Sequence, residues 1–292
     1  MPERNKTAYI TGGASGIGRA LSLHLLSKNW HVFIADRDVG AAQKFADEYN
    51  PTTGPAPGHP TLHYAECDTT SWTSQLAAFR KALDVLDGRL DFIAPIAGIA
   101  ERKWLPFPSE TLTSDEFSKP DLSVIDVDLT GVLYTIALGV QQFRRQDAVA
   151  WEGGWTGKGK IGLVASICGI YCVPSLPVYT AAKHAIVGLT RSYGALLVAE
   201  GITVNAVAPN VVRTAISSGV FYDLLEREGL LTPMEGLIDA FGEIATGGGS
   251  GEVFECGPKG GYRKRDGVEY LDDESERCCG LLLERAKPLH YN

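Results

Sequence analysis

Features that mark membrane, nucleic-acid and metal-binding proteins are missing from this sequence. No apolar run reaches the roughly 18 residues needed to span a bilayer, and the polar start, residues 1–5, leads directly into a strand pattern. We therefore expect no signal peptide, no membrane partner and a cytoplasmic location. The net charge is −8 and no helix pattern gathers Lys and Arg, which argues against nucleic acid as a partner. The six cysteines form no C-x-x-C pair and no Cys/His ligand spacing, so we expect reduced thiols and no bound metal.

No Gly/Ser linker, internal repeat or low-complexity segment divides the 292 residues, and 45% of them are hydrophobic. Strand patterns alternate with helix patterns along the chain. This alternation predicts an α/β fold: a single doubly wound Rossmann-type domain whose parallel sheet of about seven strands is flanked by helices. We place the domain over residues 1–256 and a C-terminal tail over 257–292, which docks on the domain or on a neighbouring subunit, or is partly disordered. The expected strands are 6–10, 31–35, 61–66, 90–94, 161–165, 202–208 and 253–255, with loops over 50–60, 101–120 and 151–160.

The first predicted strand leads into a glycine-rich loop and then a helix. Glycines at 12, 16 and 18 permit a tight turn and a close approach of the backbone to a pyrophosphate. The helix that follows directs its N–H groups and its positive dipole end at that anion. Asp36 ends the second strand 18 residues after Gly18, where a carboxylate would hydrogen-bond a ribose hydroxyl. The pattern predicts a dinucleotide site, and a glycine turn without a ligand is the alternative.

Tyr179 and Lys183 are four residues apart on a predicted helix, so their side chains leave one face a single turn apart. A lysine ammonium beside a phenol favours the phenolate and lowers the pKa of the phenol. Ser166 ends a predicted strand thirteen residues before Tyr179 and can hydrogen-bond a substrate oxygen. The three residues together predict a general acid/base that moves a proton at an alcohol or ketone oxygen.

Over residues 6–256 the chain resembles the short-chain dehydrogenase/reductase family, because a set of motifs follows in that family's order. The glycine spacing is G-x-x-x-G-x-G, and the later motifs are Cys67-Asp68, Ala97-Gly98, Ser166, Tyr179 with Lys183, and Asn205 to Pro209. Residues 179–189 and 209–216 are most similar to the branch of NAD-dependent 15-hydroxyprostaglandin dehydrogenases.

The resemblance implies reversible oxidation of a secondary alcohol to a ketone with a nicotinamide cofactor. Its catalytic residues would be Ser166, Tyr179, Lys183 and Asp128. Its cofactor-binding residues would be Gly12, Ser15, Gly16, Ile17, Gly18, Asp36, Arg37, Asp68, Thr69, Ala97, Gly98, Tyr179, Lys183, Pro209, Val212 and Thr214.

Some of these residues have a specific implied role. The family's aspartate at Asp68 binds the adenine amino group, although a helix N-cap is the alternative. Thr214 matches a threonine that contacts the nicotinamide amide. Asp36 favours NAD because a carboxylate repels a 2′-phosphate, whereas Arg37 beside it could bind that phosphate, so NADP stays possible.

The family also suggests a substrate and an assembly. Residues 215–248 would be a mobile lid over a small-molecule substrate, or simply a packed helix pair, and the long helices over 121–145 and 177–200 would join a homodimer or homotetramer. Aromatic residues in the loops suggest a bulky, apolar substrate, with packing aromatics as the alternative. The residues concerned are Trp104, Trp151, Trp155, Phe221 and Tyr222.

Three positions depart from the family pattern. Pro95 and Ile96 replace two asparagines, and a proline cannot donate a backbone hydrogen bond. Asp128 replaces the catalytic asparagine that holds a proton-relay water, and its charge would alter the pKa values of Lys183 and Tyr179 with a net sign that the sequence leaves open. Asn210 replaces a glycine after a strand, where we expect it to take the left-handed conformation. Asp128 and the lost asparagines keep one alternative, a cofactor-binding scaffold for a non-redox cyclisation or isomerisation. Arg37 as a phosphate contact keeps another, an NADPH-dependent biosynthetic ketoreductase.

Overall fold

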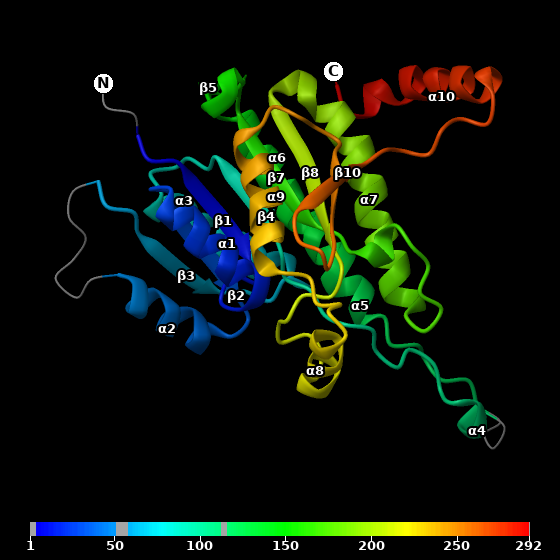
Figure 1. Cartoon of the computed structure of the whole chain (residues 1–292). Helices are drawn as coiled ribbons and strands as arrows, with labels where there is room; N and C mark the ends of the chain where they lie inside the picture. Colours follow the sequence, from blue (N-terminus) through cyan, green and yellow to red (C-terminus); the bar gives the residue numbers. More distant parts are fainter. Residues whose placement is uncertain (1–3, 51–57, 112–115, 292) are drawn as a thin grey trace.

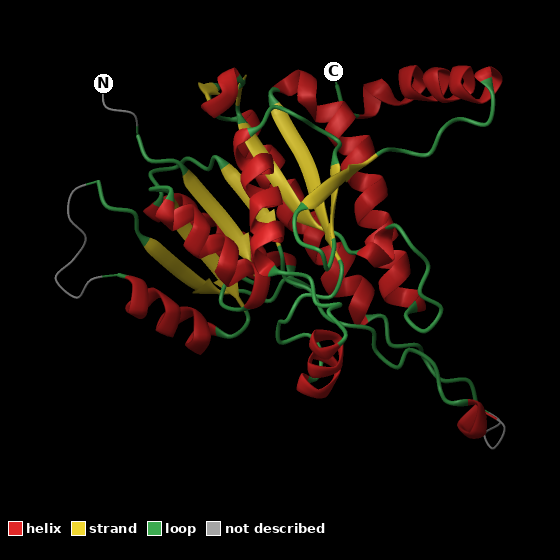
Figure 2. Ribbon diagram, in the orientation of Figure 1, coloured by secondary structure: helices red, strands yellow, loops and turns green. Residues whose placement is uncertain are grey.

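A computed structural model describes residues 4–50, 58–111 and 116–291 of the chain. Most of the proline-rich loop predicted over 50–60 lies outside the described residues. Strands and helices alternate along the chain as the sequence predicts (Figures 1 and 2).

One sheet of eight strands organises the described residues, in the order β10-β9-β8-β7-β4-β1-β2-β3. All neighbouring pairs are parallel except β9 with β10, which is antiparallel. The predicted doubly wound α/β fold is confirmed, with one strand added from the predicted tail. The strands are β1 (Thr7–Thr11), β2 (His31–Asp36), β3 (Leu62–Glu66), β4 (Phe92–Pro95), β7 (Gly159–Val164), β8 (Ile202–Pro209), β9 (Val253–Cys256) and β10 (Tyr262–Arg265).

Helices cover both faces of the sheet. On one face α3 (Trp72–Val85), α6 (Val132–Arg144) and α7 (Pro177–Leu197) bury side chains such as Phe79 and Ile186 against the strands. On the other face α1 (Gly16–Ser27), α2 (Val39–Tyr49) and α9 (Met234–Thr246) bury side chains such as Leu25 and Phe241. Successive residues of β1 serve the two faces in turn, with Tyr9 in the first cluster and Ile10 in the second.

The strand order reverses beside β1. The chain runs from β1 to β2 and β3 on one side, then crosses to β4, β7 and β8 on the other. In open α/β sheets a ligand binds at such a switch point, outside the carboxyl ends of the strands. The fold therefore places the candidate site at the ends of β1, β4 and β7.

The segment predicted as a glycine-rich loop over 151–160 is partly structured. It forms a two-stranded ribbon of β5 (Val149–Ala150) and β6 (Thr156–Gly157) around the short helix η2 (Glu152–Gly154). Lys160 follows and is fully buried, with its ammonium 4.0 Å from the centre of the Trp155 ring and 4.7 Å from that of Trp151. Burial is the main cause that lowers the pKa of Lys160 to about 8, and the charge of Lys6 adds to it.

One continuous helical stretch, Ser123–Arg144, has the length and apolar composition of a membrane span, with a mean hydropathy of 1.5. Asp126 and Asp128 interrupt the stretch, so it contains no unbroken apolar run of about 18 residues, but its average composition meets the criterion. Half of the stretch is buried inside the domain, where Ile136 and Phe143 pack against the sheet. A core helix shows the same composition because it packs against a buried sheet.

The predicted tail contributes β10 and two further elements. After β10 the chain leads to α10 (Asp273–Ala286), which extends away from the sheet in Figure 1 and has no buried residue. The short helix η5 (Lys287–Leu289) follows, and the Tyr291 hydroxyl then donates a hydrogen bond to the Leu196 carbonyl of α7. The tail thus returns to the domain at its last described residue.

Candidate active site

The glycine loop after β1 is shaped for close contact. Gly12 and Gly16 have φ of +67° and +50°, a backbone conformation that glycine adopts without strain. A side-chain carbon on Gly12 would lie 2.7 Å from Cα of Ala97, and one on Gly16 would lie 3.2 Å from Cβ of Thr214. One on Gly18 would collide with the carbonyl of Gly12. Five predicted cofactor positions are therefore involved in close contacts that only glycine permits at 12, 16 and 18.

The first turn of α1 is suited to an anion. Its N-cap residue Ser15 makes no side-chain capping hydrogen bond, and the turn contains no acidic residue. The first backbone N–H bonded within the helix is that of Arg19, which donates to the Ser15 carbonyl. Helix N–H groups left in this state attract phosphate. This end of α1, with Ile17 in its first turn, fits the pyrophosphate of a dinucleotide.

Asp36, at the end of β2, is tied to the glycine loop. Its carboxylate accepts hydrogen bonds from the backbone N–H of Ala14 and of Asp38, each at 3.0 Å. The side chain is half-buried, whereas Arg37 is exposed. The carboxylate is therefore held in place beside the glycine loop.

Asp68 is not a helix N-cap, so this alternative is wrong. Ser71 caps α3 by accepting from the Ser74 N–H. Asp68 instead accepts from the side chain and backbone of Thr70, and these two bonds, with the charge of Arg37, lower its pKa. Thr69 beside it is buried. The Asp68 carboxylate is largely exposed at the carboxyl end of β3, which is compatible with the adenine role.

Lys183 and Asp128 form a buried ion pair, with Nζ 3.1 Å from Oδ2. The lysine also donates to the Val164 carbonyl at the end of β7, and the other Asp128 oxygen accepts from the Ile99 N–H at 2.8 Å. Burial alone would lower the pKa of Lys183, but the charges of Asp128 and Tyr179 outweigh it and raise the pKa. Lys183 is therefore held as an ammonium.

Asp128 lies in an irregular helix. The stretch between α5 (Ser123–Ile125) and α6 is a π-helix, η1 (Asp126–Gly131). Such wide turns occur frequently at functional sites because they shift a side chain out of regular helical register. A side-chain carbon on Gly98 would lie 3.3 Å from Oδ2 of Asp128, so the loop after β4 approaches the carboxylate closely.

Tyr179 lies in the first turns of α7, with the Lys183 ammonium 5.3 Å from the centre of its ring. Burial raises the pKa of its phenol, and the charge of Asp128 adds to the rise. Lys183 and a hydrogen bond with Ser166 act in the opposite direction but do not outweigh burial. The predicted lowering of the phenol pKa by Lys183 is thus present, but burial outweighs it and the net shift is upward. Ser166 is buried and its hydroxyl accepts from the Cys168 N–H at 3.1 Å.

A family model described as short chain dehydrogenase matches residues 6–224. The chain belongs to the short-chain dehydrogenase family.

Curated relatives agree with this family. The chain is 31% identical over 222 residues to short-chain dehydrogenase/reductase ATR7 of Stachybotrys chlorohalonatus, which covers 74% of this chain and 60% of the relative. It is 33% identical over 224 residues to 5′-hydroxyaverantin dehydrogenase of Dothistroma septosporum, covering 74% and 70%. It is 31% identical over 223 residues to human 15-hydroxyprostaglandin dehydrogenase [NAD(+)], covering 75% and 73%. The chain thus spans between three fifths and three quarters of the length of these relatives. The predicted similarity to the branch of 15-hydroxyprostaglandin dehydrogenases is confirmed.

Solved structures share the fold. A 3-ketoacyl-(acyl-carrier-protein) reductase from Brucella melitensis, complexed with NADH, superposes with a TM-score of 0.68 at 20% identity, covering 87% of this chain and 98% of that one. A short-chain type dehydrogenase/reductase from Mycobacterium marinum gives 0.69 at 23% identity, covering 86% and 94%.

The short-chain dehydrogenase pattern is altered where β4 ends. Pro95 pairs with Thr11 of β1, and on its other side β4 pairs with β7 only through Phe92 and Ile93. Ile96 still donates to the Thr11 carbonyl at 3.2 Å. Pro95 therefore shortens the ladder to β7, while β1 keeps the loop in place.

The turn after β8 differs from the expectation for Asn210. This residue is not among the described residues with positive φ. Its side-chain oxygen instead accepts from the Val211 N–H at 2.8 Å, and its own N–H donates to the Cys256 carbonyl at 2.9 Å. These bonds form the turn without a left-handed residue. Pro209 ends β8, and Val212 beyond the turn is buried.

Only part of the predicted lid lies at the surface. The helix α8 (Gly219–Arg227) is mostly exposed, whereas α9 is a core helix with Leu237 and Phe241 fully buried. Tyr222 anchors α8: its hydroxyl is 3.2 Å from the Thr214 hydroxyl and accepts from the Ser217 N–H at 3.1 Å. Of the predicted lid residues, those of α8 remain the candidate for a lid, whereas α9 belongs to the core. The mobility of α8 stays a prediction.

Two of the aromatic residues assigned to the substrate lie elsewhere. Trp151 and Trp155 pack around Lys160 at the amino end of β7, whereas Ser166 follows its carboxyl end. The packing alternative is correct for both. Trp104 is half-buried in the loop after β4, and Phe221 on α8 is 41% exposed.

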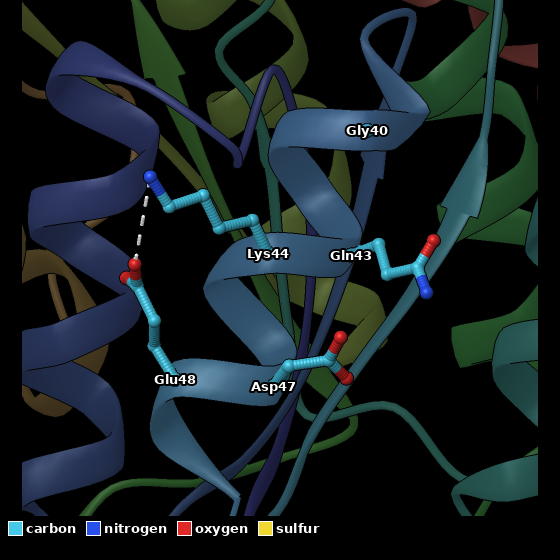
Figure 3. A pocket seen from close by; sticks show the side chains of 5 residues that line it. All are labelled: Gly40, Gln43, Lys44, Asp47 and Glu48. Atoms are coloured by element: carbon cyan, nitrogen blue, oxygen red, sulfur yellow. Dashed lines mark ion pairs between the residues drawn. The ribbon is translucent and has the colours of Figure 1, made fainter.

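The described surface also has a depression of about 460 Å³ on the outer side of α2 (Figure 3). Its lining residues belong to one helix, and Lys44 pairs there with Glu48 at 3.9 Å. It lacks the apolar enclosure that a small-molecule site requires, so we do not assign it a ligand.

Sequence reasoning missed Glu101. Its carboxylate accepts from the N–H of Tyr179 at 2.7 Å and from that of Val178 at 3.3 Å. A signal was present, because α7 begins with Leu176 and Pro177 and its first turn contains no acidic residue. A helix start without its own cap leaves N–H groups that need an acceptor from another part of the chain, from water or from a ligand.

Proposed function

We propose that the protein interconverts a secondary alcohol and its ketone with a nicotinamide cofactor. The observation that carries this proposal is the buried set at the carboxyl end of β7: Lys183 donates to the Val164 carbonyl and lies beside the Tyr179 ring, and Ser166 lies close enough to the phenol to lower its pKa. The open glycine loop at the end of β1 belongs to the same edge of the sheet.

In the oxidation direction the Tyr179 phenolate takes the proton of the substrate hydroxyl. Ser166 donates a hydrogen bond to the same substrate oxygen and orients it. The Lys183 ammonium stabilises the phenolate by its charge, and its link to Val164 fixes its position. The cofactor supplies the hydride acceptor when it is bound. In the reduction direction the Tyr179 phenol returns the proton to the oxygen.

Asp128 would hold Lys183 protonated in this mechanism. Its carboxylate is fully buried between the lysine and the Ile99 N–H. The family's asparagine is neutral, so it would remove the negative charge that pairs with the Lys183 ammonium. We therefore propose that Asp128 orients Lys183 and makes Tyr179 a weaker acid than an asparagine would.

We propose NAD(H) as the preferred cofactor. The Asp36 carboxylate is held in place by two backbone N–H groups, and a fixed negative charge repels a 2′-phosphate. The charge of Arg37 acts on Asp68, which reduces its availability for a phosphate. A fluorescence titration with NADH and, separately, NADPH tests this preference, and tighter NADPH binding would favour the ketoreductase alternative.

We propose a bulky, largely apolar substrate. Apolar side chains of α8 are exposed, among them Val220 at 80%, Phe221 at 41% and Leu224 at 45%. Two relatives are named as dehydrogenases of hydroxylated compounds, 5′-hydroxyaverantin and 15-hydroxyprostaglandin. Secondary alcohols of increasing apolar size should show rising kcat/KM, and a constant value across the series would contradict this class.

Replacing Tyr179→Phe tests the acid/base role. The variant should lose turnover in both directions, because no other group replaces the phenol, while NADH binding stays within about twofold of wild type. Turnover near that of the wild type would show that another group moves the proton. A wild-type protein that binds NADH but turns over none of the alcohols or ketones would favour the scaffold alternative.

The oligomeric state and the cellular location are two further properties of the protein. We propose a homodimer or homotetramer joined through exposed positions of α6 and α7, which light scattering of the purified protein tests. A cytoplasmic location stays a prediction from the sequence, and cell fractionation tests it.

A further inference from the structure

Glu101 connects the loop after β4 to the helix that carries Tyr179. Its half-buried carboxylate accepts two hydrogen bonds, from the backbone N–H of Tyr179 at 2.7 Å and of Val178 at 3.3 Å. The helix has no cap of its own, since Leu176 makes no side-chain capping bond and Pro177 follows it. Glu101 is thus a cap supplied by a residue 76 positions away from the first helical residue.

A carboxylate suits this position for two reasons. Hydrogen bonds from N–H groups to an ionised acceptor are stronger than those to a neutral one. The negative charge also interacts favourably with the positive end of the helix dipole. The bonded N–H at 2.7 Å belongs to Tyr179 itself, so the contact fixes the backbone from which the phenol projects.

The same short segment reaches two other parts of the site. The backbone of Ala97 lies in close contact with Gly12 of the glycine loop, and the Ile99 N–H donates to the Asp128 carboxylate. Residues 97–101 therefore touch the predicted cofactor loop, the carboxylate beside Lys183 and the first turn of α7. These contacts set the distance between the cofactor position and the phenol.

We propose that Glu101 is a positioning residue for the acid/base Tyr179. It holds the first turn of α7 against the loop after β4 and so keeps the phenol at its working distance from the cofactor and substrate. The inference rests on the proposed alcohol–ketone activity. Misplacement of a reacting group by about 1 Å can cost on the order of 100-fold in rate, so loss of the cap should act on kcat.

The test compares Glu101→Ala and Glu101→Gln in steady-state kinetics and in NADH titrations. We expect Glu101→Ala to lower kcat about tenfold or more, with the Kd of NADH within about twofold of wild type, because the cap touches no cofactor-binding side chain. Glu101→Gln keeps one acceptor oxygen for the Tyr179 N–H and should recover part of the lost kcat. Asp272→Ala removes a carboxylate cap from the exposed helix α10 and should leave kcat unchanged.

Two kinetic outcomes would overturn the proposal. A rise in KM with unchanged kcat in Glu101→Ala would show that the carboxylate contacts substrate. Equal losses in the Gln and Ala variants would show that hydrogen-bond acceptance is not its role. Thermal unfolding shows whether each variant folds. If Glu101→Ala does not fold, the kcat of Glu101→Gln alone tests the proposal.

Amide hydrogen exchange provides a readout that does not depend on turnover. Exchange in the first turn of α7, around residues 178–180, should quicken in Glu101→Ala and stay unchanged in Asp272→Ala. Unchanged exchange in Glu101→Ala would refute the capping role. If exchange quickens but the wild type turns over no alcohol or ketone, the proposed function fails while the cap stands.

Discussion

Asp128 is the residue at which this chain departs most from its family in chemistry. It introduces a buried negative charge 3.1 Å from the lysine ammonium. The same charge raises the pKa of Lys183 and contributes to the raised pKa of Tyr179. The sequence alone left the net sign open, because attraction to lysine and repulsion of phenolate act on different groups. The geometry shows that both pKa values move upward.

Replacing Asp128→Asn should shift the pH dependence of alcohol oxidation to lower pH. Oxidation needs the Tyr179 phenolate, and the phenolate forms at lower pH once the carboxylate that disfavours it is removed. The measurement is kcat against pH for both proteins. A profile that shifts to higher pH, or does not shift, would mean that Asp128 does not act on Tyr179 through its charge.

The identities of the site residues could be predicted from spacing, because the glycine loop and the Tyr179/Lys183 pair are local patterns. The structure brings the predicted residues to one edge of the sheet, and their functional roles stay predictions. Glu101 could not be found in this way. The uncapped start of α7 indicates that an acceptor is needed, but its partner lies far along the chain and no residue type marks which carboxylate supplies it.

At the scale of elements, α8 is held to the chain before it by one buried tyrosine and by exposed ion pairs. Tyr222 is 3% exposed and its hydroxyl meets Thr214 and the Ser217 N–H. Arg213 pairs with Asp223 and Glu226 of the helix, each at 2.9 Å. The residue predicted to contact the nicotinamide amide is therefore also an anchor of α8.

Replacing Tyr222→Phe should loosen α8 without unfolding the domain. The variant loses the contacts of one buried hydroxyl, which costs about 1–2 kcal/mol in the free energy of unfolding. We expect KM for the alcohol to rise because α8 closes less often over the site. Steady-state kinetics and chemical denaturation check both effects, with Tyr49→Phe on α2 as the control. A KM equal to that of wild type would show that α8 takes no part in substrate binding.

Elements with strong periodicity were predictable, and those formed by context were not. The stretch around Asp128 has an ordinary helical pattern, so its π-helix could not be seen in advance. Strand β10 reads Tyr262-Arg263-Lys264-Arg265 and lacks the apolar alternation of a strand. It forms because the edge of β9 that faces away from β8 has backbone N–H and C=O groups with which β10 pairs.

At the scale of the whole molecule, Asp91 joins the start of the chain to the centre of the sheet. Its fully buried carboxylate pairs with Arg4 at 2.6 Å and Arg89 at 3.1 Å, and accepts from the Thr7 N–H at 2.9 Å. Burial alone would raise the pKa of Asp91, but these partners outweigh it and lower the pKa from its ordinary value of 3.8.

Replacing Asp91→Ala should destabilise the protein by about 2–3 kcal/mol at pH 7, since it leaves a buried N–H and two arginine side chains without this acceptor. The lowered pKa means that the stabilisation by Asp91 is complete above about pH 4 and is lost as the pH falls through the folded-state value. Urea denaturation of both proteins at several pH values measures this. The difference in stability should shrink at low pH, and a constant difference would show that the carboxylate charge is not what stabilises.

The position of β10 has a consequence for how the molecule behaves at high concentration. An open sheet ends in a row of unpaired N–H and C=O groups, to which a second sheet can add. On one side that row belongs to β10, a four-residue strand with three cationic side chains, of which Lys264 pairs with Glu252 and Arg265 with Glu255, so that Arg263 is the cation that two molecules would have to bring together. Without it the row would belong to β9, whose Val253, Phe254 and Cys256 are buried. We therefore expect β10 to hinder association of sheets between molecules. A chain that ends at residue 256 lacks β10 and should aggregate more readily.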